Sequence, residues 1–244
     1  MKRKKHTNVV FDANKMLLSE DSPFTVKEAY KTLRTNVAFS LPGNNCKCIA
    51  TTSANRGDGK TSVAINLAIS IANINKKVIV VDCDMRLPTV ASKIGISTRP
   101  GLSNLLAGDI ESDTPIIRRV KKYGIDVLVS GDVPPDPTPL LSSSQMTGLI
   151  DTLRNYYDYI ILDFPPVYMV TDAAILSKYI DGYLIIVRHD SSEYSKIQET
   201  LRQLDFADAK IIGFVYNCKS NDSNYKNGKK YYYYNKYYKK SDKN

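Results

Sequence analysis

The chain has 244 residues and a net charge of +9, and its two ends hold that charge. Residues 2–5 contribute +4 and residues 219–244 contribute +6, which leaves residues 7–218 at about −1, so the basic pI does not indicate a nucleic-acid groove and no nucleic acid is expected. No apolar run reaches the ~18 residues of a membrane helix, and the four cysteines lack zinc or disulfide spacing, which fits a reducing cytoplasm.

The N-terminal part is expected to be an irregular basic arm, residues 1–22, followed by a helix from Pro23. Thr25 is the expected N-cap, and apolar residues recur at spacings of three and four. The polar face carries Glu28, Lys31 and Arg34. Exposed i,i+3 pairing explains these charges without an interface.

The next stretch, residues 47–66, is an apolar strand that turns through small residues into a helix starting near Lys60. Backbone N–H groups at such a helix start form a cradle for phosphates. Lys60 would reach the β- and γ-phosphates, and the Thr61 hydroxyl would bind Mg²⁺. The match to G-x-x-x-x-G-K-[ST] is imperfect because Ala54 occupies the first glycine position, and a strand–loop–helix turn that merely contains Gly-Lys-Thr is the alternative.

Two further apolar strands, residues 78–82 and 159–163, end in carboxylates. The first ends in Asp82-Cys83-Asp84, and the second ends at Asp163. Carboxyl ends of parallel strands meet at the edge where open α/β sheets bind ligands. Mg²⁺ takes one or two carboxylates together with phosphate oxygens and water, so these residues suit a magnesium nucleotide.

The rest of the chain alternates between helices and strands. Helices are predicted over 101–108, 144–156, 171–179 and 191–204, and strands over 125–129, 182–187 and 210–215. The proline-rich residues 131–139 are expected to be neither helix nor central strand. Continuously apolar strands between helices predict one α/β domain, residues 23–218, with a parallel sheet flanked by helices on both faces. Residues 219–244, rich in Tyr and Lys, are expected to be a disordered tail.

Three motifs in this order, with the tyrosine-rich tail, resemble the bacterial tyrosine kinases of capsule and exopolysaccharide synthesis, in the form of the Gram-positive cytoplasmic kinase chain. Residues 54–61 are similar to the family's A-x-P-G-E-G-K-S, residues 82–86 to D-x-D-x-R and residues 163–166 to D-x-P-P. The resemblance runs from Pro23 to the C-terminus. The chain departs from it at Arg56, where proline is usual, and at Lys31 in the oligomerisation motif E-x-x-R-x-x-R.

The resemblance implies a P-loop NTPase fold and an ATP- and Mg²⁺-dependent protein-tyrosine kinase. Lys60, Asp82, Asp84, Arg86 and Asp163 are the expected catalytic residues. Among these, Asp84 and Asp163 would hold Mg²⁺ with Thr61, and Asp82 would accept or orient the tyrosine proton. Arg86 either neutralises phosphate charge or pairs with an acid, and Asn217 either contacts adenine or ends a strand. The expected nucleotide-binding residues are Ala54, Asn55, Arg56, Gly57, Asp58, Gly59, Lys60, Thr61, Ser62 and Asn217.

The tail is expected to be the substrate of autophosphorylation, because seven of the 17 tyrosines lie within residues 225–238, which hold no Leu, Ile, Val or Phe. A sticky, compositionally biased tail is the alternative. The expected phosphoacceptors are Tyr225, Tyr231, Tyr232, Tyr233, Tyr234, Tyr237 and Tyr238.

The expected partners also follow from the resemblance. They are a transmembrane adaptor of the polysaccharide co-polymerase type, a cognate tyrosine phosphatase, and further copies of the chain in a ring joined through Glu28, Lys31 and Arg34, which would phosphorylate one another. The kinase would be cytoplasmic, held at the inner face of the membrane by its adaptor, and would regulate polysaccharide synthesis and export. Partition and septum-site ATPases are the alternative class. Their loop has a second lysine where Asn55 stands here.

Overall fold

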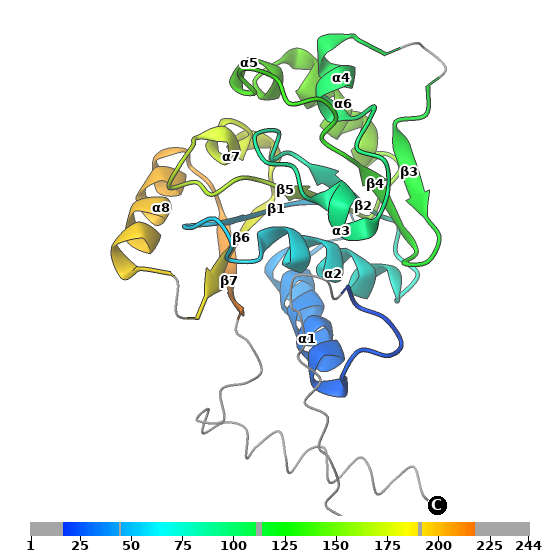
Figure 1. Cartoon of the computed structure of the whole chain (residues 1–244). Coiled ribbons are helices and arrows are strands. Elements are labelled where there is room, and N and C mark those ends of the chain that lie inside the picture. Colours follow the sequence, from blue (N-terminus) through cyan, green and yellow to red (C-terminus); the bar gives the residue numbers. More distant parts are fainter. Residues whose placement is uncertain (1–16, 44, 111–113, 190–191, 218–244) are drawn as a thin grey trace, which may run out of the picture.

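The computed structural model describes residues 17–43, 45–110, 114–189 and 192–217. Within them, seven strands form one sheet in the order β3-β4-β2-β5-β1-β6-β7 (Figure 1). Every neighbouring pair is parallel except β3 and β4. The strands are β1 (Lys47–Ser53), β2 (Val78–Asp82), β3 (Ile117–Val120), β4 (Ile125–Leu128), β5 (Tyr159–Asp163), β6 (Gly182–Arg188) and β7 (Ile211–Asn217).

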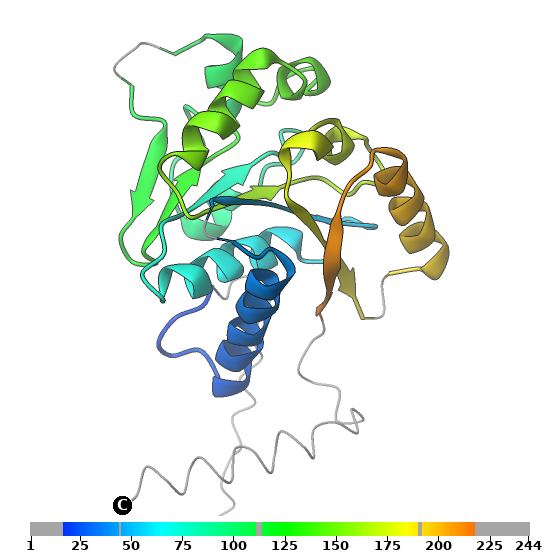
Figure 2. The ribbon, with the colours of Figure 1, turned by 180° about the vertical axis from the view of Figure 1, so that it is seen from behind.

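Helices cover both faces of the sheet (Figures 1 and 2). On one face, the core is shared with α1 (Phe24–Ser40), α2 (Lys60–Ala72) and α3 (Val90–Ile94). The other face packs against α4 (Leu102–Ala107), α5 (Thr138–Leu141), α6 (Ser144–Arg154), α7 (Asp172–Ile175) and α8 (Tyr194–Phe206). A 3₁₀ turn, η1 (Ser177–Tyr179), follows α7.

The side chains of each strand point alternately into the core on one face of the sheet and the core on the other. In β5, Ile161 faces the α2 side while Ile160 and Leu162 face the α6 side, and all three are fully buried. Successive side chains of a strand point to opposite faces, so a continuously apolar strand fills two cores at once. This confirms the predicted α/β fold with helices on both faces.

Several boundaries differ from the sequence predictions. Helix α1 begins at Phe24 with Pro23 at its N-cap and no side-chain cap, so Thr25 is not the cap. Helix α5 begins at Thr138 and includes Pro139, which the sequence placed in a loop. Proline is tolerated in the first helical turn because its missing N–H has no partner there.

Besides α5, two short elements were not predicted, namely α3 and the antiparallel edge strand β3. The predicted helix over 171–179 is the four-residue α7 followed by the 3₁₀ turn η1. These segments hold too few apolar residues for a period to be visible in the sequence.

Part of the expected N-terminal arm is packed against the domain. Leu17 and Leu18 are buried on the α2 side, and the Leu18 N–H donates to Asn66 Oδ1 at 2.8 Å. The described residues of the arm are irregular, as expected, yet they belong to the core. None of the described helices combines the length and apolar character needed to cross a membrane.

The candidate site lies where the central strands end. Thr51 of β1 and Asp82 of β2 are both in register with Asp163 of β5. The loop after β1 leads into α2, so loop, helix start and carboxylates meet at one edge of the sheet.

Candidate functional site

The loop between β1 and α2 has the backbone that the phosphate motif requires. Gly57 and Gly59 have φ angles of +88° and +96°, a region that side chains with a Cβ rarely adopt. A Cβ on Gly59 would come within 2.2 Å of Asn217 Nδ2. Lys60 and Thr61, the first residues of α2, are largely buried, at 7% and 6% exposure. Their functional groups therefore sit inside the site.

The buried carboxylate of Asp58 holds the loop from within. Its Oδ2 accepts the Asn55 N–H at 3.1 Å and the Ser192 hydroxyl at 3.2 Å. Asp58 is fully buried. It therefore positions the cradle and does not line the cleft.

Two residues from distant strands hold the loop from outside. Arg188 at the end of β6 donates from Nη1 to the Gly57 carbonyl at 2.7 Å. Asn217 at the end of β7 donates from Nδ2 to the Asp58 carbonyl at 2.8 Å. Arg188 was not predicted from the sequence, where its signal is a cation at the carboxyl end of a strand. In this structure the Asn217 amide contacts the loop.

Asp163, at the carboxyl end of β5, connects this edge of the sheet to the start of α2. Its Oδ2 accepts the Thr61 hydroxyl at 2.5 Å, and its Oδ1 accepts the Thr51 hydroxyl at 3.2 Å. Burial raises the pKa of Asp163 to about 6, although Lys60 and the Thr61 hydrogen bond oppose that rise. Thr89 also contacts Thr61, with the two hydroxyl oxygens 2.9 Å apart.

Asp84 is the carboxylate that faces the cleft. Its Oδ2 lies 3.9 Å from Lys60 Nζ, and its side chain is 11% exposed. Its Oδ1 accepts the Leu87 N–H at 3.1 Å. Burial raises the pKa of Asp84, and the positive charges of Lys60 and Arg56 counteract it.

Asp82 is enclosed, and the cleft does not reach it. Its Oδ1 accepts the Asp84 N–H at 3.2 Å, and its Oδ2 accepts the Val90 N–H at 3.1 Å. Burial raises its pKa well above the usual range, with a further rise from the charge of Asp163. Asp82 thus ties the loop after β2 to the start of α3.

Arg86 pairs with an acid, which was one of the two alternatives for it. Its Nε and Nη2 donate to the two carboxylate oxygens of Asp172 at 3.0 and 3.1 Å. The Asp172 side chain is 1% exposed, and Asp136 lies 3.9 Å away on the solvent side. A bidentate pair with a buried carboxylate fixes the orientation of the guanidinium.

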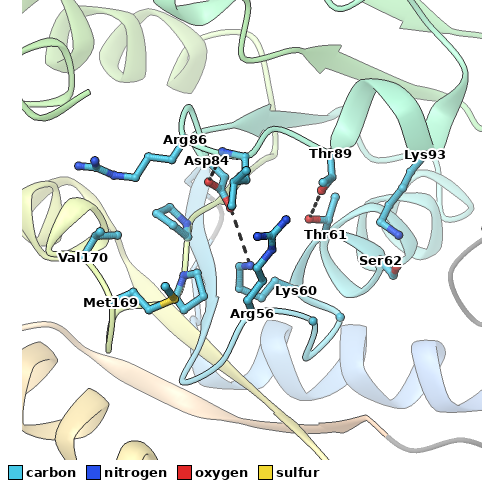
Figure 3. Close-up of a pocket in the computed structure, with 15 residues that line it drawn as sticks. Arg56, Lys60, Thr61, Ser62, Asp84, Arg86, Thr89, Lys93, Met169 and Val170 are labelled. Carbon is cyan, nitrogen blue, oxygen red and sulfur yellow. Dashed lines mark hydrogen bonds and ion pairs between the residues drawn. The ribbon is translucent and has the colours of Figure 1, made fainter. Parts of the chain in front are cut away.

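These residues surround a cleft of about 280 Å³ (Figure 3). Cationic side chains line it together with an apolar wall that includes Met169 and Val170. Five lining residues belong to no motif and were not predicted from the sequence, namely Leu87, Thr89, Lys93, Met169 and Val170. The lining residues are Arg56, Gly57, Gly59, Lys60, Thr61, Ser62, Asp84, Arg86, Leu87, Thr89, Lys93, Pro165, Pro166, Met169 and Val170.

The donors suit a metal ion that arrives with a phosphate ligand. Among the residues that the structure describes, no group of three or more His, Cys, Asp or Glu could hold a metal by itself. The Thr61 hydroxyl and the Asp163 carboxylate nevertheless converge beside the phosphate cradle. One hydroxyl and one carboxylate, completed by phosphate oxygens and water, make a suitable magnesium site.

The expected interface residues have partners within their own chain. Lys31 pairs with Glu28 at 2.7 Å on the exposed face of α1. Arg34 donates to the Ser70 carbonyl and, at 3.3 Å, to the Ser70 hydroxyl on α2. The expected phosphoacceptors in the tail lie outside the described residues.

Two relatives of this chain are both named as tyrosine-protein kinases. The family model described as "AAA domain" matches residues 46–206. The putative tyrosine-protein kinase CapB of Staphylococcus aureus is 31% identical over 86% of this chain and 90% of its own length. The putative tyrosine-protein kinase EpsB of Ralstonia nicotianae is 36% identical over 78% of this chain. The match covers only 25% of that longer protein.

A solved structure has the same fold over most of the chain. The chimerical protein CapA2B2 superposes with a TM-score of 0.74 at 32% identity, covering 81% of this chain and 85% of its own.

Proposed function

The chain belongs to the bacterial tyrosine-protein kinases of capsule synthesis, and on that premise we propose that it transfers phosphate from ATP to its own C-terminal tyrosines and thereby regulates polysaccharide synthesis and export. The observation that carries the proposal is the convergence of Lys60, Thr61 and two carboxylates at one phosphate cradle. Phosphoryl transfer asks little covalent chemistry of the protein, so positioning and charge neutralisation are the main tasks of such a site.

The side chains divide these tasks by their positions. Lys60 and the loop N–H groups would hold the phosphates, and Thr61 with Asp163 would hold Mg²⁺, with Asp84 contributing through a water molecule. When bound, the ion would neutralise phosphate charge. In the transfer step, a bond forms between the tyrosine oxygen and the γ-phosphorus, the bond to the bridging oxygen breaks, and ADP leaves with that electron pair.

The tyrosine proton must pass to a base during this step. A tyrosine hydroxyl has a pKa near ~10, so a carboxylate accepts its proton in concert with transfer. We assign this role to Asp84, because it lines the cleft, whereas both oxygens of Asp82 are occupied by backbone N–H groups. For Asp82, the acceptor expected from the sequence, we propose instead that it holds the Asp84 backbone in place.

The tail tyrosines are the proposed acceptors. Each phosphotyrosine adds about −1.5 to −2 charges, so seven of them would add about −10 to −14. Residues 219–244 carry +6 before modification. Phosphorylation would therefore reverse the sign of the tail and weaken its attraction to an acidic, nucleotide-loaded cleft and to the anionic inner leaflet.

The proposed partners are a transmembrane adaptor, a tyrosine phosphatase and other copies of the chain. The similarity to the CapA2B2 chimera supports an adaptor of the CapA type. Such an adaptor would keep the kinase in the cytoplasm, at the inner face of the membrane. In a ring, the tail of one subunit would reach the cleft of its neighbour.

One experiment tests the function. The full chain is incubated with ATP and Mg²⁺, with and without the cytoplasmic tail of a candidate adaptor, and both phosphotyrosine and free phosphate are measured. Phosphotyrosine that depends on ATP supports the kinase. Phosphate release without phosphotyrosine in both arms would support the partition-type ATPase instead.

A further inference from the structure

Four cationic side chains line the cleft, namely Arg56, Lys60, Arg86 and Lys93, and they differ in how they are engaged. Lys60 faces Asp84, Arg86 is held by the buried Asp172, and Lys93 has an interaction of its own. Arg56 makes no hydrogen bond or ion pair with any residue that the structure describes. Its guanidinium is therefore available to a ligand.

The position of Arg56 places that free charge at the centre of the cleft. Figure 3 shows its guanidinium beside Lys60 and Asp84, whereas Arg86 extends away from them. The effect of the Arg56 charge on the pKa of Asp84 agrees with this closeness. Arg56 is thus a second cationic group, besides Lys60, that faces the candidate reacting centre.

The backbone that carries Arg56 is fixed on both sides. The preceding N–H, of Asn55, donates to Asp58 Oδ2 at 3.1 Å, and the following carbonyl, of Gly57, accepts from Arg188 Nη1 at 2.7 Å. A charged group on a fixed loop needs little reorganisation when charge develops beside it, which makes its electrostatic effect large.

We propose that Arg56 is a catalytic residue whose guanidinium neutralises the charge on the phosphoryl group during its transfer. This inference rests on the proposed kinase function of the same cleft. A planar guanidinium can donate two hydrogen bonds to two phosphate oxygens at once, which a lysine cannot do. Arg56 keeps all its protons, and the proton released by tyrosine passes to the carboxylate. The chain thus supplies this second cation from its own phosphate loop.

The test compares Arg56→Gln and Arg56→Lys with Arg202→Gln, an exposed arginine of α8 that pairs with Glu199. In the full chain with Mg²⁺, Arg56→Gln should lower kcat about 10²-fold, the scale of one positioned donor. Its affinity for ADP should stay within about threefold, while its affinity for ADP with aluminium fluoride, which mimics the phosphoryl group in transit, should fall in parallel with kcat. Arg56→Lys should recover part of both losses, and Arg202→Gln should match the wild type.

Two results would overturn the proposal. One is a wild-type kcat in Arg56→Gln. The other is a rise in KM and in the ADP dissociation constant with kcat unchanged, which would make Arg56 a nucleotide-holding residue only. Unchanged thermal unfolding of Arg56→Gln, expected for an exposed side chain, excludes misfolding as the cause. A wild-type chain that makes no phosphotyrosine contradicts the kinase function, and the binding measurements still decide whether Arg56 recognises the phosphoryl group.

Discussion

Individual residues in and beneath the cleft carry charges that suit a triphosphate bound with a metal ion. Asp82 and Asp163 are fully buried, and burial raises the pKa of both. Buried charges are costly unless a partner compensates them, and such arrangements are common at functional sites. The lysine and the carboxylates are placed to share a ligand that brings both negative oxygens and a cation.

Lys60→Met should remove phosphoryl transfer while leaving the fold intact. Lys60 lies 3.9 Å from the Asp84 carboxylate in the cleft, and a methionine fills similar space without the charge. We expect a loss of at least ~10²-fold in tyrosine phosphorylation and little change in thermal unfolding. Lys76→Met, at an exposed ion pair with Asp158, is the matched control. Normal autophosphorylation by Lys60→Met would contradict the cradle assignment.

Asp84→Asn and Asp82→Ala should separate proton transfer from loop support. Asp84→Asn keeps an oxygen for the Leu87 N–H, so its stability should be close to that of the wild type. Because an amide cannot accept the tyrosine proton, the rate of transfer should fall at least ~10²-fold. Asp82→Ala leaves two buried N–H groups without acceptors, which should cost about 2 kcal/mol of unfolding free energy in urea titrations. A fully active Asp84→Asn would return the base role to Asp82.

Cys46 provides a test of pH dependence away from the cleft. Burial raises the pKa of its thiol to about 11, with Arg154 opposing and Asp181 adding to the rise. A thiol is protonated below its pKa, so iodoacetamide should label Cys46 at pH 8 at least ~10-fold more slowly than in the urea-unfolded chain, where the pKa is about 8.5. The difference in labelling rate between the folded and the unfolded chain should disappear as the pH approaches 11. Peptide mapping assigns the label, and equal rates in both states at pH 8 would contradict this.

At the scale of elements, the phosphate loop is held by strands that are remote in sequence. Arg188 of β6 and Asn217 of β7 both donate to its carbonyl groups. Helix α1 is tied to α2, the helix that begins at Lys60, through Arg34 and Ser70. These hydrogen bonds connect α1 and the β7 edge to the two elements that build the candidate site.

Glu28→Lys and Arg34→Glu distinguish a subunit interface from packing within the chain. If both residues bridge subunits, each variant should shift the unphosphorylated protein toward monomer in light scattering. The contact of Arg34 with Ser70 predicts that Arg34→Glu also lowers thermal stability, whereas Glu28→Lys should not, because exposed ion pairs contribute little. An unchanged mass in both variants would leave Glu28 and Lys31 as an ordinary surface pair.

For the whole molecule, charge is divided between a nearly neutral domain and basic ends. A positive tail can be attracted to a neighbour's nucleotide-loaded cleft and to an anionic membrane surface at moderate ionic strength. Both attractions would weaken if the tail tyrosines were phosphorylated, as proposed. Phosphorylation would then favour dispersal of the proposed ring of subunits.

Removal of residues 225–244 should abolish autophosphorylation while leaving the phosphorylation of an added tail peptide intact. A second variant, with all seven tail tyrosines changed to Phe, keeps the charge of the tail and should behave in the same way. Phosphopeptide mapping is the measurement. Label on Tyr30 or Tyr123 with an unmodified tail would show that the tail is not the substrate.

Elements whose signal is local could be predicted from the sequence alone. The strands over 78–82 and 159–163 were predicted at their observed bounds, because continuous apolar runs ending in aspartate are legible without a partner. The phosphate loop was equally legible, since its glycines and its Gly-Lys-Thr sequence meet local backbone requirements.

Which of these residues face the cleft, and what holds them, depends on contacts between distant parts of the chain. The sequence could not show that Asp82 is enclosed while Asp84 faces Lys60, because both follow the same strand. It left two alternatives for Arg86, whose partner Asp172 lies 86 residues away, and it missed the support from Arg188. Such pairings depend on the order of strands in the sheet and on the closeness of their ends, and no local pattern of residues encodes either one.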